Sequence, residues 1–305
     1  MGKISVVMST YNERIEFLSL ALESIINQSY KNLEFIIILD NPQNSEIKNC
    51  VYKHSLLDNR IRVIENDKNI GLTASLNKGF KVATGDFYAR MDADDISDPS
   101  RLEMELAYLL ENNLDLTGCM TRRIDENGVV VNNLTNISYP TDFLEKKLLF
   151  DNCIAHPTWL FKRKLFDRLN GYREIKTAED YDFLLRAIKS GFKLGICNSC
   201  LFSYRISLAG ISRSNSLRQF LTSDFLQKNL YKIDDINQEY IDCEILSKID
   251  KERNDKFEEG VKLLNKAIEQ FKHTNPLAII SLIRAIFHSP YIMLKVYKIF
   301  KIHTI

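Results

Sequence analysis

The chain has 305 residues, of which 45% are hydrophobic and 27% are charged, and its 41 basic and 40 acidic residues give a net charge of +1. This length and composition are typical of a soluble globular protein with one large α/β domain and an appendage, or with two modest domains. The balanced charge argues against a broad basic surface, so we expect no nucleic-acid partner.

The first hundred residues alternate between strand and helix patterns. Short apolar, β-rich runs predict strands, and between them apolar residues recur at helical spacing. The predicted strands are residues 4–9, 35–39, 61–65 and 87–91, and the predicted helices are residues 15–26, 45–57 and 72–83. Repeated units of this length predict a parallel sheet with helices on both faces, in which ligands gather beyond the carboxyl ends of the strands.

Beyond residue 95 the pattern becomes less regular. A helix is expected at residues 99–112, with Pro99 in its first turn, and Asp125-Glu126-Asn127-Gly128 predicts a hairpin between strands at residues 117–124 and 129–132. Further helices are predicted at residues 144–150, 164–168 and 180–190, and residues 216–272 are expected to be mostly helical.

Residues 271–305 contain no acidic residue, and basic residues interrupt a strongly apolar sequence. The uncharged stretches are shorter than the roughly 20 apolar residues that cross a bilayer, and Pro290 breaks them. A helical hairpin in the membrane interface fits this pattern; the alternative is a helical pair that packs on the protein or across a dimer. Because residues 4–8 run directly into polar sequence, we expect no signal peptide and a cytoplasmic protein on the inner-membrane surface.

Three carboxylates follow the fourth predicted strand within four residues, at Asp92, Asp94 and Asp95. Carboxylates this close together repel one another unless a cation lies among them. Mg²⁺ and Mn²⁺ bind carboxylate oxygen and readily share a phosphate-bearing ligand. The sequence therefore indicates a divalent-metal site, and the alternative is an acidic turn that caps the next helix.

Polar residues also follow the first and second predicted strands. Ser9-Thr10-Tyr11-Asn12-Glu13 ends the first and Asp40 ends the second, so both are expected at the sheet edge that carries Asp92 and Asp94. The Tyr11 ring can stack on a base, and the Asp40 carboxylate can accept a hydrogen bond from the N3–H of uracil. The alternatives are a helix N-cap and a turn residue, respectively.

Several motifs occur in one order along the chain. They are Thr10-Tyr11-Asn12-Glu13, Asp40, Asn69-Ile70-Gly71-Leu72 through Asn77-Lys78-Gly79, Asp92-Ala93-Asp94 and Ala178-Glu179-Asp180-Tyr181-Asp182. As a series they resemble the family 2 glycosyltransferases of the GT-A fold, especially bacterial enzymes that build surface polysaccharides. The resemblance covers about residues 3–215.

The resemblance implies an α/β protein whose catalytic domain is a Rossmann-like, nucleotide-binding α/β/α sandwich. Residues 1–96 would form its nucleotide-binding half and residues 97–215 its acceptor half. Beyond the region of resemblance, the sequence pattern predicts a C-terminal α-helical appendage at residues 216–305, for which membrane association is the interpretation favoured above.

The resemblance also implies roles for the matching residues. Those implied to bind the UDP-sugar are Thr10, Tyr11, Asn12, Glu13, Asp40, Gly71, Asn77, Lys78, Asp92 and Asp94. Within this set, Asp92 would touch the ribose and Asp94 would hold Mg²⁺ or Mn²⁺ across the diphosphate. Asp180 matches the family's catalytic base, and His156 and Glu179 would lie on the acceptor side.

Elementary chemistry agrees with these roles. A metal ion stabilises charge on the departing diphosphate, and a carboxylate takes the proton of the acceptor hydroxyl. Direct attack from the opposite face inverts the anomeric centre, as the family does. The expected acceptor is a glycan, in particular a lipid-linked oligosaccharide in the synthesis of a bacterial O-antigen or capsule.

Two departures from the family pattern stand out. Asn41-Pro42 follows Asp40 where many relatives have a second acidic residue and Gly-Ser, and no histidine follows Tyr204-Arg205, so Arg205 or Arg213 is expected to meet the phosphates. Three other functions stay possible: a phosphatase or mutase, a sugar nucleotidyltransferase, and a non-catalytic membrane-associated scaffold. The first needs an aspartate pair after strand one, the second needs a glycine-rich loop there, and the third does not need Asp94 or Asp180.

Overall fold

The computed structural model describes residues 2–135, 141–206, 216–233 and 236–304. By internal contacts the chain divides into two compact units. The sheet unit comprises residues 1–145, 152–174 and 186–207, and the helical unit comprises residues 146–151, 175–185 and 208–305. The predicted domain boundary at residue 215 stays a prediction, since these compact units interleave along the chain.

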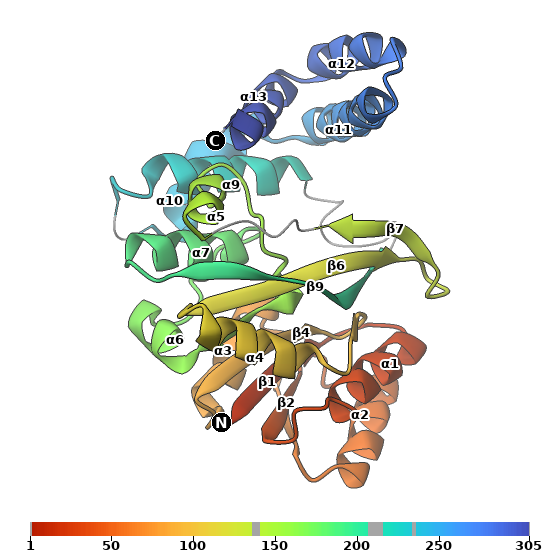
Figure 1. Cartoon of the computed structure of the whole chain (residues 1–305), viewed down its shortest axis with the longest axis vertical. Helices are drawn as coiled ribbons and strands as arrows, with labels where there is room; N and C mark the ends of the chain where they lie inside the picture. The colour runs from red at the N-terminus through yellow and green to blue at the C-terminus, as the bar shows by residue number, and fades with distance from the viewer. Residues whose placement is uncertain (1, 136–140, 207–215, 234–235, 305) are drawn as a thin grey trace. The chain divides into compact units, whose positions relative to one another are not determined.

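The amino-terminal half of the sheet unit is a parallel sheet in the order β3-β2-β1-β4 (Figure 1). Its elements are β1 (Ile4–Thr10), α1 (Ile15–Ile26), β2 (Leu33–Leu39), α2 (Ser45–Leu57), β3 (Ile61–Glu65), α3 (Leu72–Val82) and β4 (Phe87–Asp92). Every residue of β1 is buried, because helices cover both faces. On one face Gly79 of α3 lies so close that an added Cβ would be 2.5 Å from Val7 Cγ1. The predicted parallel β-α arrangement is confirmed.

The sheet continues from β4 in the order β8-β6-β9-β5, and β7 pairs with β6. The elements are β5 (Ile96–Ser97), α4 (Arg101–Glu111), β6 (Leu116–Ile124), β7 (Val130–Thr135), α5 (Thr141–Leu148), the short η1 (His156–Thr158), β8 (Leu160–Lys162), α6 (Arg163–Leu169) and β9 (Leu194–Arg205). β8 runs antiparallel to both β4 and β6, whereas β6 and β9 are parallel. The predicted hairpin is confirmed between β6 and β7, and Gly128 in its turn has φ +80°.

The helical unit contains the start of α7 (Glu179–Lys189) and the helices that follow residue 215. These are α9 (Ser216–Asn229), α10 (Gln238–Ile245), η2 (Leu246–Lys248), α11 (Lys251–Lys272), α12 (Leu277–His288) and α13 (Pro290–Thr304). The predicted helical region is therefore confirmed, with a break before α11, where the Asp250 side chain accepts a hydrogen bond from Arg253 N. Among the described helices, none combines the length and the apolar character needed to cross a membrane.

Arg101 and Glu105 of α4 form a buried pair of ionisable side chains, on a helix that packs against β6, β8 and β9. Arg101 Nη1 donates to the Pro157 carbonyl and Nη2 to the Arg90 carbonyl, while Arg101 Nε is 3.9 Å from Glu105 Oε2. Burial raises the pKa of the Glu105 carboxyl to about 8, although the Arg101 charge opposes that rise. Glu105 is therefore mostly protonated in the folded protein at neutral pH.

We expect Glu105→Gln to remove part of the pH dependence of stability. Because the folded pKa of about 8 lies above the usual unfolded value, the contribution of Glu105 is complete below the unfolded pKa and is lost as the pH rises toward 8. In urea unfolding at pH 5 and pH 9, the free energy of unfolding of Glu105→Gln relative to the wild type should be higher at pH 9 than at pH 5. Glu111→Gln, an exposed change at the end of α4, is the control; equal pH dependence of wild type and Glu105→Gln would contradict the expectation.

Candidate functional site

The acidic turn follows β4 directly at the carboxyl edge of the parallel sheet. Asp92 is the last residue of β4, and Asp94 and Asp95 lie in the turn before β5. Arg90 Nη2 donates to Asp92 Oδ1 at 2.5 Å, and Arg205 donates from its backbone N to Asp95 Oδ1 at 2.7 Å and from Nε to the Asp94 carbonyl at 2.8 Å. Two nearly fully buried arginines thus hold the turn in place.

Negative charge nevertheless exceeds what these arginines offset. Burial, then the neighbouring Asp92 and Glu13 carboxylates, raise the pKa of Asp94 to about 7. Burial, then Asp92 and Asp94, raise the pKa of Asp95 well above its usual value. A crowded set of carboxylate oxygens is the donor chemistry that Mg²⁺ and Mn²⁺ prefer, so these residues fit such an ion.

The carboxylates of the acidic turn would supply only part of the coordination shell of such a metal ion. Within the described part of the chain, no group of three or more His, Cys, Asp or Glu side chains is arranged to hold an ion. Mg²⁺ usually takes one or two carboxylates and completes its shell with water and substrate phosphates. The Asp92–Asp94 turn is therefore suited to a metal that arrives with a diphosphate.

Asp40 organises the loop that precedes α3. Its Oδ1 accepts hydrogen bonds from Asn66 Nδ2 at 2.7 Å and Ile70 N at 2.9 Å, and its Oδ2 accepts one from Gly71 N at 2.9 Å. Gly71 has φ +86°, a backbone conformation that favours glycine. These three hydrogen bonds leave Asp40 almost fully buried, at 3% exposure, and fix the backbone of the loop before α3. Asn66 was not singled out in the sequence.

The segment after β1 is held at the same edge. In the sheet register, Ser9 lies beside Asp92 and Thr10 beside Leu39, the residue before Asp40. The sequence prediction that these strand ends meet is thus confirmed. Tyr11 is 43% exposed, which leaves its ring open to contact with a ligand.

Internal hydrogen bonds shape this segment. Glu13 Oε2 accepts from Thr10 Oγ1 at 2.5 Å and from Tyr11 N at 2.8 Å. Asn12 Oδ1 accepts from the side-chain amides of Asn41 and Asn44, at 2.8 Å and 3.2 Å. The two strand ends are therefore joined by side-chain contacts as well as by the sheet.

Asn77 and Lys78 of α3 contact different parts of the sheet unit. Lys78 Nζ donates to Asn66 Oδ1 at 2.7 Å and to the Glu65 carbonyl at 3.1 Å, which links it to the Asp40 loop. Asn77 instead exchanges two hydrogen bonds with the backbone of Tyr172, at 2.8 Å and 2.9 Å. Lys78 thus lies with the predicted nucleotide-binding residues, whereas Asn77 lies with Tyr172.

His156 meets the same tyrosine. Its Nε2 is 2.9 Å from the Tyr172 hydroxyl, and its ring packs 4.6 Å from the Trp159 ring, centroid to centroid. Burial, then the Arg90 charge, lower the pKa of His156 well below its usual value. The imidazole is therefore neutral near pH 7 and able to donate or accept a hydrogen bond.

Arg205, which the sequence suggested as a phosphate contact, makes several contacts within the sheet unit. In addition to its contacts with the acidic turn, its Nη1 donates to the Asp125 carbonyl at 2.9 Å, and its guanidinium lies 4.1 Å from the centre of the Phe17 ring. This buried guanidinium links the acidic turn to the β6–β7 hairpin, while its Nη2 atom has no hydrogen-bond partner among the described residues. A contact between Arg205 and a phosphate stays a prediction. Arg213, the other residue considered, lies outside the described residues.

Glu179 and Asp180 lie in the helical unit, in the first turn of α7, where carboxylates are stabilised by the helix dipole. Asp180 Oδ1 accepts a hydrogen bond from Tyr181 N at 2.7 Å, and the Tyr181 hydroxyl donates to the Leu148 carbonyl at 2.7 Å. Thr177, just before the helix, has φ +75°, which a β-branched residue rarely adopts. Strain of this kind concentrates at functional sites.

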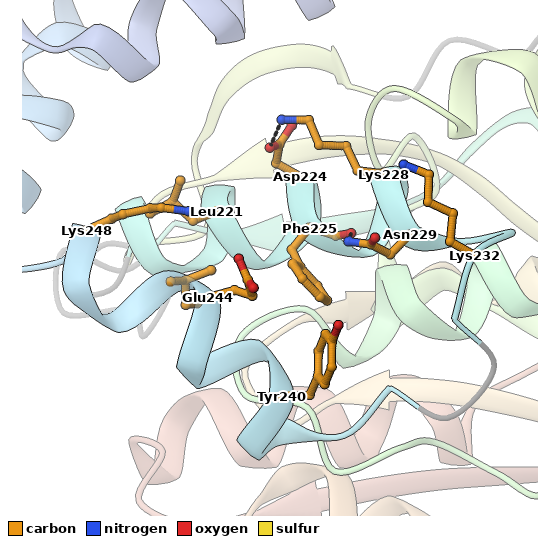
Figure 2. A pocket seen from close by; sticks show the side chains of 10 residues that line it. Leu221, Asp224, Phe225, Lys228, Asn229, Lys232, Tyr240, Glu244 and Lys248 are labelled. Atoms are coloured by element: carbon orange, nitrogen blue, oxygen red, sulfur yellow. Dashed lines mark hydrogen bonds and ion pairs between the residues drawn. The ribbon is translucent and has the colours of Figure 1, made fainter.

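A pocket of about 310 Å³ opens elsewhere in the helical unit, between α9, α10 and η2 (Figure 2). Phe225 and Tyr240 face each other in it, and at its rim Lys228 pairs with Asp224 at 2.6 Å. Its lining includes none of the residues that the sequence predicted for the site.

The chain matches known glycosyltransferases in sequence. Residues 5–169 match the family model described as glycosyl transferase family 2. An uncharacterized glycosyltransferase of Methanocaldococcus jannaschii is 36% identical, with 75% of this chain and 79% of that protein covered. The O-antigen biosynthesis glycosyltransferase WbnJ of Escherichia coli is 34% identical, with 72% of this chain and 90% of that protein covered.

Solved structures match the fold at lower identity. The mannosyltransferase PcManGT of Pyrobaculum calidifontis, solved with GDP-Man and Mn²⁺, has a TM-score of 0.61 at 16% identity, with 99% of this chain and 85% of that chain covered. S. aureus TarS, solved with UDP-GlcNAc, has a TM-score of 0.60 at 16% identity, with 95% and 90% covered. The predicted GT-A fold with a helical C-terminal region is thereby confirmed.

Proposed function

The chain belongs to glycosyl transferase family 2 and is a glycosyltransferase, and we propose that it moves a sugar from a UDP-sugar to a hydroxyl group with inversion at the anomeric carbon. The observation that carries the proposal is the acidic turn. There burial and neighbouring carboxylates raise the pKa of Asp94 to about 7, beside Asp92 and at the ligand-binding edge of the sheet. A cation that arrives with a diphosphate would stabilise the charged form of this carboxylate.

The donor nucleotide would lie along the strand ends. We assign the exposed Tyr11 ring to stacking on the base, Asp40 to a hydrogen bond with the base, and Asp92 to the ribose. Asp94 would hold Mn²⁺ or Mg²⁺, which supplies charge stabilisation on the departing diphosphate. A structural relative bound to UDP-GlcNAc and another bound to GDP-Man and Mn²⁺ support a nucleotide-sugar donor.

The acceptor hydroxyl needs a group that takes its proton as the new bond forms. We assign this role to Asp180, whose carboxylate is oriented by its hydrogen bond from Tyr181 N. Glu179 and the neutral His156 would line the acceptor side and exchange hydrogen bonds with its hydroxyls. Attack on the face opposite the diphosphate requires no covalent intermediate and inverts the centre.

The name of a relative supports the acceptor class that we propose. WbnJ, which covers most of this chain, is named for O-antigen biosynthesis. We therefore propose a lipid-linked oligosaccharide of a bacterial surface polysaccharide as the acceptor. An acceptor held in a membrane requires an enzyme at the membrane surface, so the proposal includes peripheral association with the cytoplasmic face of the inner membrane.

Calorimetric titration with UDP and with GDP tests the donor site. We expect UDP to bind in Mn²⁺, to lose at least tenfold in affinity in EDTA, and to bind more tightly than GDP. Preferential binding of GDP would contradict the assignment of uridine. Incubation with a panel of UDP-α-sugars and analysis of the product linkage by NMR tests the stereochemistry, and an α-linked product would contradict inversion.

A further inference from the structure

Helix α12 exposes most of its large apolar side chains to solvent. Its buried residues are small, namely Ala278, Ser281 and Ala285. Its exposed apolar residues are Leu277, Ile279, Ile280, Ile283 and Phe287, the last of them 86% exposed. A helix on the surface of a water-soluble protein normally shows the opposite arrangement, with the large apolar residues inside.

Packing inside the helical unit explains this orientation. Helices α11 and α12 lie side by side (Figure 1), and Gly260 of α11 provides a close approach. A Cβ added at Gly260 would lie 3.3 Å from the Ala285 carbonyl oxygen and 2.6 Å from Ile292 Cγ1. The small residues of α12 fit this seam, and Leu282 and Ile286 pack partly against the helical core. The other large apolar residues of α12 remain exposed.

Helix α13 adds a second exposed row. Met293, Tyr297 and Phe300 are spaced so that they share one face of the helix, and all three are more than half exposed. The opposite face is fixed by Lys298, which is buried and lies 2.9 Å from Asp224 Oδ1 and 2.6 Å from Gln227 Oε1 of α9. This polar anchor sets the rotation of α13 and keeps the apolar row on the surface.

Basic residues are the only charged side chains on α12 and α13 themselves, and Glu259 of the neighbouring α11 lies 3.2 Å from His288 Nε2. Residues 271–305 contain five basic residues and no acidic one. Arg284 is exposed on α12, and Lys301 Nζ lies 5.8 Å from the centre of the exposed Tyr297 ring. An apolar face bordered by cations complements an anionic lipid surface, in which apolar side chains enter the acyl boundary and cations meet the headgroups.

We propose that the outward rows of α12 and α13, hereafter the apolar rows, dock on an anionic lipid bilayer with both helices in the interface. The absence of a spanning helix among the described residues agrees with a mode that lies on the membrane. The biological role of this docking rests on the proposed function, because docking would bring the enzyme to a lipid-linked acceptor. Membrane binding itself is measured independently of catalysis.

Co-sedimentation of the full chain with vesicles tests the proposal. We expect binding to vesicles that contain phosphatidylglycerol, weaker binding to pure phosphatidylcholine, and weakening of the first by salt. The double variant Ile283→Glu/Phe287→Glu should lose at least tenfold in vesicle affinity. The matched control, Leu56→Glu/Leu57→Glu, places the same charges on side chains of the sheet unit that are 87% and 76% exposed, and should bind vesicles as the wild type does.

Two results would overturn the proposal. One is equal vesicle binding by both double variants. The other is a wild type that ignores vesicles but is dimeric by light scattering, with Ile283→Glu/Phe287→Glu monomeric, because a second copy would then cover the apolar rows. Calorimetric binding of UDP by both variants, equal to that of the wild type, establishes that they are folded. Loss of vesicle binding with UDP binding intact separates this surface from the donor site.

Discussion

Asp94→Asn is expected to abolish metal-dependent UDP binding and, at the same time, to stabilise the metal-free protein. The pKa of Asp94 is raised to about 7 by burial and by Asp92 and Glu13. A raised pKa means that the charged carboxylate is disfavoured in the folded state, so the stability contribution of Asp94 is complete below its unfolded pKa and is lost as the pH rises through 7. Asparagine keeps the shape and removes the repulsion, but it gives up the metal ligand.

Two measurements check this expectation. Calorimetric titration of UDP in Mn²⁺ should show at least a tenfold loss in affinity, equivalent to about 1.4 kcal/mol or more. Thermal unfolding in EDTA at pH 8 should show a higher melting temperature for Asp94→Asn than for the wild type. Asp67→Asn, an exposed aspartate near the Asp40 loop, should change neither quantity. A lower melting temperature together with intact UDP binding would make Asp94 a structural residue.

The parallel half of the sheet was predictable because burial leaves a local signature. Strand β2 is buried along nearly its whole length, so residues 35–39 form a continuous apolar run, and the polar residues that follow β1 and β2 mark the edge of the sheet where ligands are expected. The pairing of Ser9 with Asp92 follows from the parallel register of β1 and β4, which the alternating strand and helix pattern already predicts.

Strands β8 and β9 lack such a signature. β8 has only three residues, and β9 contains polar Asn198 and Ser199 at a register shift, where Cys197 and Cys200 face the consecutive Cys119 and Met120. The irregular pairing disrupts the two-residue period on which strand prediction depends. Neither β8 nor β9 is therefore among the strands expected from the sequence.

Tertiary structure determines which residue each side chain of the site contacts. Nothing in the sequence shows that Asn77 bonds the Tyr172 backbone, 95 residues away, or that Arg205 is buried against Phe17. These contacts depend on how the two halves of the sheet unit pack, which residue spacing does not record. The ordered motifs thus indicated which residues gather at the sheet edge, while the structure adds the hydrogen bonds by which residues such as Asn77 and Arg205 hold other segments.

Asp180→Asn is expected to lower kcat by about 10²- to 10⁴-fold, the usual contribution of a general base, and to leave UDP affinity unchanged. The substitution is conservative for the fold, because the amide oxygen can still accept the hydrogen bond that Asp180 Oδ1 takes from Tyr181 N. Steady-state kinetics with the donor identified by the panel, together with UDP titration, separate the two quantities.

Glu179→Gln is the matched control for that prediction. Glu179 and Asp180 both lie in the first turn of α7, so each neutralisation forfeits a similar helix-dipole contribution, typically about 0.3–1 kcal/mol. The two variants should therefore lose similar stability in urea unfolding, while Glu179→Gln mainly raises KM for the acceptor. An equal loss of kcat in both variants would contradict the assignment of Asp180 as the base. The loss of one negative charge at the start of α7 would then explain both results.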